Sequence, residues 1–327
     1  MIISRTPFRV SFVGGGTDLQ AFWSKEEGQV LSTSINKYIY VTVKKQLNFV
    51  EFKYRISWNK LEFVNNIEDI EHPIIREALK MLKIDFPLEI TTFADIPSST
   101  GLGSSSSFTV GLLHALYALK GERVTKNRLA EEAAHIEINM LGRPIGKQDH
   151  YAAAYGNLNI IKFLTNSDTM IYPVLYKKEV VEKLSKNLLL FYTYQKRDAH
   201  KILEEQKDKT IDKFDNLKKM KNLVPLLEEV ISKGNLDEFG RLLHQNWILK
   251  REITDKISNS AIDEYYNKAI NAGAIGGKLL GAGGGGFLLF YVPPEKQEAV
   301  RNALSELYEL RFNFDTAGTR IIYYNQN

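Results

Sequence analysis

Residues 97–107 read Pro-Ser-Ser-Thr-Gly-Leu-Gly-Ser-Ser-Ser-Ser and lead directly into the apolar run 108–119. The glycines predict a tight turn, and the apolar run predicts a helix that begins near Ser104. A helix N-terminus presents unpaired backbone N–H groups and the positive end of the helix dipole, a combination that binds phosphate. The segment lacks the Gly-Lys-Ser/Thr ending of a Walker A loop. It therefore predicts a phosphate-binding loop of another lineage, and a serine-rich helix cap is the alternative.

A second glycine cluster occupies residues 276–286, which read Gly-Gly-Lys-Leu-Leu-Gly-Ala-Gly-Gly-Gly-Gly. It contains a G-x-G-x-x-G pattern, but the dinucleotide-binding fingerprint of that form follows a strand and opens a helix. Here the glycines precede a predicted strand over 286–292. Five glycines in six residues carry a large entropic cost. This density predicts that the backbone comes very close to another group, and an ordinary tight turn is the alternative.

A third cluster opens the chain, where residues 5–18 read Arg-Thr-Pro-Phe-Arg-Val-Ser-Phe-Val-Gly-Gly-Gly-Thr-Asp. Alternating polarity predicts a strand that ends at the glycines, with Arg9 and Asp18 near one strand end. In order and spacing, clusters 5–18, 97–107 and 276–286 resemble the first, second and third motifs of the GHMP small-molecule kinases (galacto-, homoserine, mevalonate and phosphomevalonate kinases). More narrowly, nearly the whole chain resembles bacterial D-glycero-D-manno-heptose 7-phosphate kinases, with further likeness in residues 35–43, 72–79 and 146–156.

The chain is long enough for two domains, each with its own core. The resemblance implies an α+β protein with the two-lobed GHMP kinase fold. Its N-terminal lobe would be like domain 2 of ribosomal protein S5 and its C-terminal lobe ferredoxin-like, with the substrates in the cleft between them. We place a nucleotide-binding domain at 1–186 and a second domain at 187–327. Periodicity predicts a largely helical stretch over 196–271, further helices over 73–83, 104–120, 126–141 and 295–309, and strands over 8–13, 30–43, 49–57, 87–94, 158–163, 276–281, 286–292 and 320–324.

Composition excludes several classes of protein. Apolar residues make up 44% and charged residues 25% of the 327 positions, as in an ordinary globular enzyme. The absence of cysteine excludes disulfides and thiolate chemistry, and the six histidines lack a zinc-binding spacing. The net charge of +4 fits anionic substrates, whereas the lysines of 196–221 alternate with acidic residues, so we expect no nucleic-acid partner. Without a signal peptide or a membrane-spanning run, we expect a cytoplasmic protein with no membrane partner.

Two carboxylates are candidates for the chemistry. Glu137 lies at the edge of an apolar stripe in the predicted helix 126–141, where burial is costly without a cationic partner. Asp149 follows a turn-rich segment that returns the chain to the same region, so the pair predicts a metal ligand and a base. The resemblance implies that Glu137 and Ser105 hold Mg²⁺ and that Asp149 faces the acceptor hydroxyl. The alternatives are an ion pair between Glu137 and Arg128, and Asp149 as the cap of the alanine-rich segment 151–155.

The first motif supplies the remaining candidates. By the resemblance, Arg9 lies near the transferring phosphoryl group and stabilises the charged form of Asp149, which makes both residues catalytic. Asp18 matches a position that binds sugar hydroxyls in galactokinases, and Gly15-Gly16 replaces a Glu-His pair there, which predicts a wider site. The nucleotide-binding set is Pro97, Ser99, Thr100, Gly101, Leu102, Gly103, Ser104, Ser105 and Ser106. The substrate-binding set is Gly14, Gly15, Gly16, Thr17, Asp18, Gly146, Lys147, Gly283 and Gly284.

The resemblance implies an ATP- and Mg²⁺-dependent kinase of the anomeric hydroxyl of D-glycero-D-manno-heptose 7-phosphate, with the 1,7-bisphosphate as product. ATP and a sugar phosphate would be its partners, and the oligomeric state is open. Candidate ligands of the substrate phosphate are Arg143, Lys147, Lys196 and Arg197. The alternatives are an anomeric kinase of fucose or galactose, and a catalytically silent sugar-binding sensor on the same fold. Joint presence of Ser105, Glu137 and Asp149 argues against the sensor, which needs none of them.

Overall fold

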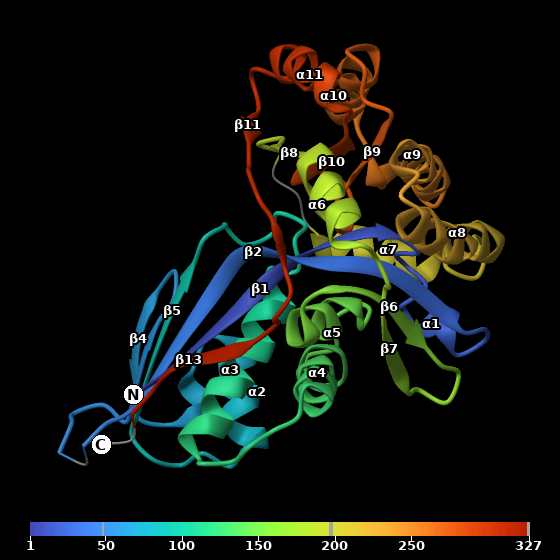
Figure 1. The fold of residues 1–327 in the computed structure, drawn as a ribbon. Coiled ribbons are helices and arrows are strands. Elements are labelled where there is room, and N and C mark those ends of the chain that lie inside the picture. The colour runs from blue at the N-terminus through green and yellow to red at the C-terminus, as the bar shows by residue number, and fades with distance from the viewer. Residues whose placement is uncertain (48, 196–198, 326–327) are drawn as a thin grey trace.

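The computed structural model describes residues 1–47, 49–195 and 199–325. Within these ranges nine strands form one sheet, whose central order is β13-β1-β2-β5-β3-β4, while β6 and β12 pair with β2 and β7 pairs with β6 (Figure 1). The strands are β1 (Ile2–Val13), β2 (Gly28–Lys45), β3 (Tyr54–Ser57), β4 (Leu61–Val64), β5 (Leu88–Ala94), β6 (Leu158–Phe163), β7 (Thr169–Pro173), β12 (Phe314–Asp315) and β13 (Arg320–Tyr324).

Helices cover one face of this sheet. They are α2 (Pro73–Met81), α3 (Ser104–Leu119), α4 (Lys126–Ala134), the π-helical segment η2 (His135–Met140) and α5 (Gln148–Tyr155). The short elements α1 (Gln20–Trp23) and η1 (Ile67–Asp69) lie in connections. Helix α3 is apolar on nearly all sides and therefore packs in the core. It lies very close to β1, because the hydroxyl of Ser4 donates to the carbonyl of Gly111 at 2.7 Å and Ser107 Oγ donates to the Pro7 carbonyl at 2.9 Å.

A second sheet has the antiparallel order β11-β8-β10-β9, with β8 (Leu188–Tyr192), β9 (Gly276–Leu279), β10 (Phe287–Tyr291) and β11 (Tyr308–Glu309). Its helices and turns are α6 (Lys178–Asn187), α7 (Ala199–Asp208), α8 (Phe214–Lys233), α9 (Leu236–Arg251), η3 (Asp255–Ile257), α10 (Ser260–Asn271), η4 (Pro294–Lys296) and α11 (Gln297–Ala303). Strand, helices, two strands, helix and strand in this order make a ferredoxin-like unit. The predicted ferredoxin-like C-terminal lobe is therefore confirmed.

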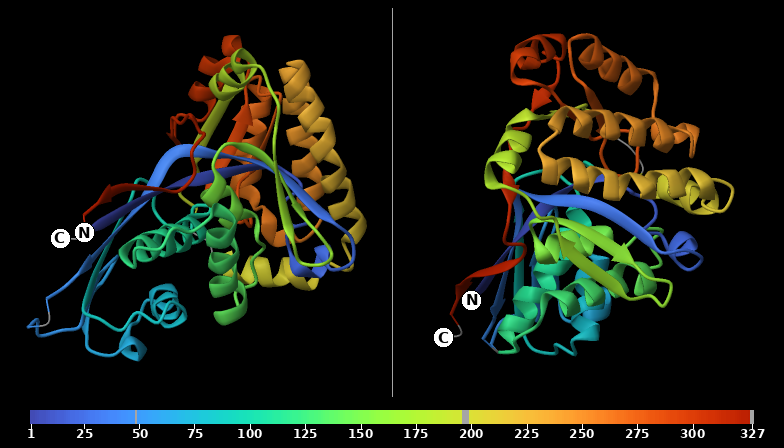
Figure 2. Two further views of the ribbon diagram at one scale, coloured as in Figure 1. Left: turned by 60° about the horizontal axis from the view of Figure 1, so that its bottom comes forward. Right: turned by 45° about the vertical axis from the view of Figure 1, so that its right-hand side comes forward.

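The two lobes share a packed interface. Helices α8 and α9 lie against the face of the large sheet opposite α3 and α5 (Figure 2). The rings of Phe12 on β1 and Phe239 on α9 meet edge to face at 5.1 Å. The chain also crosses back, because β12 pairs with β2 and β13 pairs with β1. The predicted boundary at 186/187 falls in the last turn of α6, directly before β8, but residues 314–315 and 320–324 belong to the large sheet by hydrogen bonding rather than to the second lobe.

Most predicted elements are present, and the departures have local causes. The predicted helix 126–141 changes from α- to π-helical at His135. The predicted strand 49–57 is ordered as a strand only from Tyr54. The predicted helix 295–309 was too long, because α11 ends at Ala303 and β11 follows. Its apolar spacing continued through Leu304 and Leu307, which are buried in the second core although they are no longer helical.

Candidate active site

The second motif forms a turn that is fixed to Arg9, in the second half of β1, and leads into α3. Gly103 has φ of +77° and precedes the helix, and Ser107 N–H donates the first helical hydrogen bond to its carbonyl at 3.0 Å. The backbone N–H groups of residues 104–106 therefore precede the intrahelical ladder, as expected of an anion-binding helix start. Arg9 holds the loop from β1, because its N–H donates to the Leu102 carbonyl at 3.1 Å and its guanidinium to the Gly101 carbonyl at 2.7 Å.

A cavity of about 680 Å³, called the main cavity below, joins the three motifs. The predicted residues that line it are Arg9, Gly15, Gly16, Asp18, Ser99, Gly101, Gly103, Ser104, Ser105, Ser106, Glu137, Gly146 and Asp149. The structure does not bring the rest of the nucleotide set to its wall. Pro97 is exposed, Thr100 is buried with its hydroxyl bonded to the Pro97 carbonyl at 3.1 Å, and Leu102 lies in the core. These three residues support the loop.

Arg9 and Asp149 form a bidentate ion pair. Arg9 Nε lies 2.6 Å from Asp149 Oδ1, and the second contact joins Nη2 and Oδ2 at 2.7 Å. Asp149 lies in the first turn of α5, whose cap residue is Lys147. The alternative prediction, that Asp149 is the helix cap, is therefore wrong. Gly103 packs directly on the pair, since a Cβ there would lie 3.2 Å from Asp149 Oδ2 and 3.3 Å from Arg9 Cγ. The phosphate loop, a carboxylate and a guanidinium thus meet at one point.

Glu137 is completely buried and carries four polar partners. Its Oε1 accepts from Thr109 Oγ1 at 2.9 Å and lies 3.1 Å from His150 Nε2, while its Oε2 contacts Ser105 Oγ and Arg143 Nη1. Burial by itself would raise the pKa of Glu137, but His150, Arg143 and Ser105 together lower it to about 2. The alternative partner Arg128 instead pairs with Glu132, at 2.8 Å.

This arrangement fits the predicted metal ligands. Ser105 Oγ and Glu137 Oε2 are adjacent oxygen donors, and the carboxylate is ionised. Mg²⁺ prefers oxygen ligands and takes only one or two carboxylates from a protein, because water and substrate phosphates complete its shell. Accordingly, no cluster of three or more acidic or histidine side chains is found in the described ranges. Arg143 Nη1 reaches both oxygens and balances the charge of Glu137. Nothing in the local sequence indicates that His150 and Thr109 are partners of Glu137.

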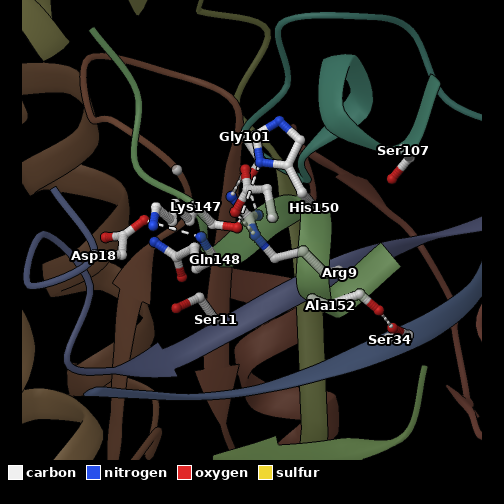
Figure 3. Close-up of polar contacts among 12 residues, drawn as sticks. Arg9, Ser11, Asp18, Ser34, Gly101, Ser107, Lys147, Gln148, His150 and Ala152 are labelled. Atoms are coloured by element: carbon white, nitrogen blue, oxygen red, sulfur yellow. Dashed lines mark hydrogen bonds and ion pairs between the residues drawn. The ribbon is translucent and has the colours of Figure 1, made fainter. Parts of the chain in front are cut away.

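Asp18 is buried in the wall of the main cavity, close enough to Asp149 to feel its charge. Its carboxylate accepts from Gly16 N–H at 3.0 Å. It also accepts from Gln148 N–H at 3.3 Å, and Figure 3 shows Asp18 and Gln148 side by side. Burial, and then the charge of Asp149, raise the pKa of Asp18. A Cβ on Gly146 would lie 1.9 Å from Asp18 Oδ2, so only glycine fits there. Gly14 and Thr17 do not line the main cavity; Thr17 Oγ1 donates to the carbonyl of Gly14 at 2.8 Å and shapes the turn.

The two central glycines of the first motif differ in their surroundings. A Cβ on Gly15 would meet no atom closer than 3.8 Å, so this position leaves room in the main cavity. A Cβ on Gly16, in contrast, would lie 2.9 Å from both Gln206 Nε2 and Leu217 Cδ2. The expected widening is therefore half right. The space at Gly16 is filled by α7 and α8 of the C-terminal lobe, which sequence reasoning could not place.

The third motif lies against the phosphate loop. A Cβ on Gly286 would lie 2.3 Å from the Thr100 carbonyl, which confirms the close backbone approach that the glycine density predicted. Gly283 and Gly284 do not line the main cavity. They pack against Ile257, whose carbonyl accepts from Gly284 N–H at 2.8 Å. Lys278 of the same motif does line it, and so does Lys250 of α9; both cations were missed at the sequence level.

Lys278 is almost fully buried, and its Nζ donates to the carbonyls of Ser11 and Phe12, each at 2.9 Å. Burial, then the charges of Lys250 and Arg9, lower the pKa of Lys278 well below its usual value. Lys250 donates to the Gly281 carbonyl. These two ammonium groups lie on the wall of the main cavity that the C-terminal lobe supplies.

The cations predicted to bind the substrate phosphate lie in different places. Lys147 Nζ donates to the Ser167 carbonyl at 2.8 Å and lies 4.4 Å from the centre of the Trp23 ring, in a second cavity of about 370 Å³. Lys196 and Arg197 lie outside the described residues. Arg143 lines the main cavity but is held by Glu137. The far end of the main cavity is aromatic and apolar, and its wall includes Trp58, His72, Ile74, Phe93, Ile96 and Phe108.

A phosphate-binding helix start, two separate carboxylates and several cations around one cavity define a phosphoryl-transfer site. Family models agree: residues 73–157 match the model of the GHMP kinases N terminal domain, and residues 223–310 match the model of the GHMP kinases C terminal domain. The chain belongs to the GHMP kinase family, as its three motifs predicted, and is a phosphotransferase that acts on a sugar hydroxyl. Members of this family use ATP, typically with Mg²⁺.

Individual relatives narrow the comparison. The chain is 29% identical to the D-glycero-alpha-D-manno-heptose 7-phosphate kinase of Campylobacter jejuni over 98% of each chain. It is 22% identical to the galactokinase of Pyrococcus furiosus over 96% of this chain and 95% of that protein. A crystal structure of a D-glycero-D-manno-heptose 1-phosphate kinase from Bacteroides thetaiotaomicron has the same fold, with a TM-score of 0.82, 24% identity, and coverage of 99% of this chain and 100% of the other. In the described ranges, no helix has the length and apolar character needed to span a membrane.

Proposed function

We propose that the protein transfers the γ-phosphoryl group of ATP to the anomeric hydroxyl of D-glycero-D-manno-heptose 7-phosphate, with Mg²⁺, to give the 1,7-bisphosphate. The observation that carries this proposal is the 29% identity, over 98% of both chains, to a kinase of that name. Galactokinases are similar at 22% identity, so galactose is the main competing substrate. The charge distribution of the main cavity supports a substrate that is itself an anion.

Among the described residues on the wall of the main cavity, Arg9 is paired with Asp149 and Arg143 with Glu137. Lys278 bonds only backbone carbonyls among the described residues, and Lys250 adds a second ammonium nearby. A buried ammonium without a carboxylate is costly, and a dianionic phosphate would offset that cost through charge-assisted hydrogen bonds. We therefore assign the substrate's own phosphate to Lys278 and Lys250, in place of the predicted Lys147.

We assign the catalytic roles from the ion pair between Arg9 and Asp149 and from the loop beside it. Asp149 takes the proton of the acceptor hydroxyl. The hydroxyl oxygen forms a bond to the γ-phosphorus of ATP, and the bond between that phosphorus and the bridging oxygen, which leaves with ADP, breaks. Arg9 holds the Asp149 carboxylate by two hydrogen bonds and places positive charge beside the transferring group. The loop amides of residues 104–106 receive phosphate oxygens of the nucleotide. The adenine base of the nucleotide would pack against the apolar part of the cavity wall that contains Trp58 and Phe108.

Ser105 and Glu137 would hold Mg²⁺, which supplies positive charge to the phosphate oxygens when it is bound. Glu137 is ionised because His150 and Arg143 surround it, so it needs no deprotonation before it can bind a cation.

An ADP-release assay tests the substrate, with heptose 7-phosphate, free heptose, heptose 1-phosphate, fucose and galactose as acceptors. We expect heptose 7-phosphate to give a kcat/KM about 10²-fold above that of free heptose, from one or two charge-assisted hydrogen bonds of about 1.5–3 kcal/mol each. Phosphorus NMR of the product should show an anomeric phosphate beside the original one. Faster turnover of galactose, fucose or heptose 1-phosphate would contradict the substrate assignment.

A further inference from the structure

Three polar side chains meet around the first-motif glycines without using their hydrogen-bonding capacity. Ser11 Oγ and Gln148 Oε1 are buried and have no partner in the described part of the chain. Gln206 of α7 is 4% exposed, and its side-chain amide makes no hydrogen bond to any described residue. All three residues line the main cavity. Buried polar atoms are almost always satisfied in proteins, so Ser11 Oγ and Gln148 Oε1 indicate a missing polar ligand, and Gln206 lines the same cavity.

The three side chains surround one place. Ser11 Oγ and Gln148 Nε2 lie 3.9 and 3.8 Å from the position that a Cβ on Gly15 would occupy. Gln206 Nε2 lies 2.9 Å from the corresponding position on Gly16. Figure 3 shows Ser11, Gln148 and Asp18 together on one side of Arg9, to its left in the view. The absent side chain of Gly15 therefore leaves a space with polar walls, and Gln206 lies next to it against Gly16.

Gln206 is held in this place from outside the cavity. Thr210 Oγ1 donates to its backbone carbonyl at 2.9 Å. The adjacent Glu205 is paired with Lys209 at 2.8 Å and with Lys256, which follows α9, at 2.6 Å. These contacts fix the backbone of Gln206 and keep its side chain at the wall of the main cavity.

The chemistry of these groups identifies the ligand. A hydroxyl and two neutral amides each offer a donor and an acceptor, which is the pattern that matches sugar hydroxyl groups and not phosphate. We propose that Ser11, Gln148 and Gln206 form a hydroxyl-binding subsite beside Asp18, and that Gln206 determines which sugar is accepted. This inference rests on the proposed function for its substrate, but the subsite itself requires only a polyol in the main cavity.

Gln206→Leu tests the subsite, because leucine keeps the volume and removes the amide. We expect the KM for the accepted sugar to rise about tenfold, near the upper value for one buried neutral hydrogen bond, while the KM for ATP changes less than twofold. Lys207→Ala, on the exposed side of the same helix, is the matched control and should behave as wild type. Among monodeoxy analogues, one should be used equally well by wild type and Gln206→Leu, since the contact is then already lost.

A second variant guards against a folding defect. Gly15→Val places methyl groups in the open part of the subsite, where the nearest atoms to a Cβ are at ordinary contact distance. Its melting temperature and ATP affinity should match wild type while sugar affinity falls, measured by calorimetry.

The outcomes separate the two proposals. A raised KM for galactose or fucose in Gln206→Leu, with heptose 7-phosphate inactive in wild type, supports the subsite and overturns the proposed substrate. An unchanged sugar KM in both variants overturns the subsite and leaves the heptose 7-phosphate assignment standing. Failure of wild type to bind any sugar of the panel overturns both.

Discussion

The two walls of the main cavity differ in how their charges are satisfied. On the wall from the N-terminal lobe, Asp149 is paired with Arg9 and Glu137 with Arg143, and each group is in place without a ligand. On the wall from the C-terminal lobe, Lys278 bonds only main-chain carbonyls among the described residues, and the amide of Gln206 faces the cavity. On the proposed function, the first wall carries the groups of the chemical step together with Ser11 and Gln148 of the hydroxyl-binding subsite, and the second wall adds Lys278 and Gln206. We therefore expect the rate to depend on the first wall and the choice of substrate to depend on both.

Asp149→Asn should have the largest effect. Asparagine keeps the shape but cannot accept the hydroxyl proton, so kcat should fall by about 10²–10⁴-fold, with little change in either KM. Asp208→Asn, an exposed carboxyl on α7, is the control. Steady-state kinetics measure both. A wild-type kcat in Asp149→Asn would remove this residue from the mechanism.

Glu137→Gln comes next and should act through the metal and through pH. The activity curve against Mg²⁺ concentration should shift to higher concentration by about tenfold or more, because a charged ligand is lost. Since the pKa of Glu137 is lowered from 4.5 to about 2 in the folded protein, its contribution to stability is present above pH 4.5 and is lost as the pH falls toward 2. Urea unfolding at pH 6 and pH 3 should show a smaller loss for Glu137→Gln than for wild type; equal losses would contradict the assignment.

Lys278→Met tests the second wall. Removal of the ammonium should lower kcat/KM for heptose 7-phosphate about tenfold and leave that for free heptose nearly unchanged, because only the phosphate contact is lost. The difference should shrink in wild type as salt rises. Loss of activity toward both sugars alike would mean that Lys278 serves the nucleotide instead.

Thr109→Val should have the smallest effect on catalysis. Thr109 donates to Glu137 from the core side of α3, at 2.9 Å, and does not line the main cavity. We expect a loss of about 1–3 kcal/mol in the free energy of unfolding with kcat within threefold of wild type. Calorimetric melting measures the first value. A large fall in kcat at unchanged stability would show that the buried side of Glu137 controls chemistry directly.

The sequence predicted mainly the wall of the N-terminal lobe, whose residues come from a few short motifs. Arg9, Glu137, Asp149 and most of residues 97–107 fall in short motifs whose local geometry follows from glycine, helix start and spacing, and the structure brings them to one cavity, with Pro97, Thr100 and Leu102 behind its wall. The other wall depends on which helix of the C-terminal lobe packs where. Gly16 shows the limit: its missing side chain predicted open space, but α7 and α8, far along the chain, fill it. His150 was missed for a related reason, since nothing in its local sequence indicates a partner for Glu137.

The return of the chain end to β1 makes the second lobe an insert. Ile2 and Tyr324 are neighbours across two hydrogen-bonded strands, and the whole ferredoxin-like unit lies between β7 and β12 in the chain. A fragment of residues 1–186 would therefore lack β12 and β13, and one edge of β1 would be left unpaired. Conversely, because Asn325 N–H donates to the Met1 carbonyl at 2.9 Å, a short linker between these two residues would close residues 1–325 into a ring, so that the chain could be opened in a surface loop without cutting the sheet.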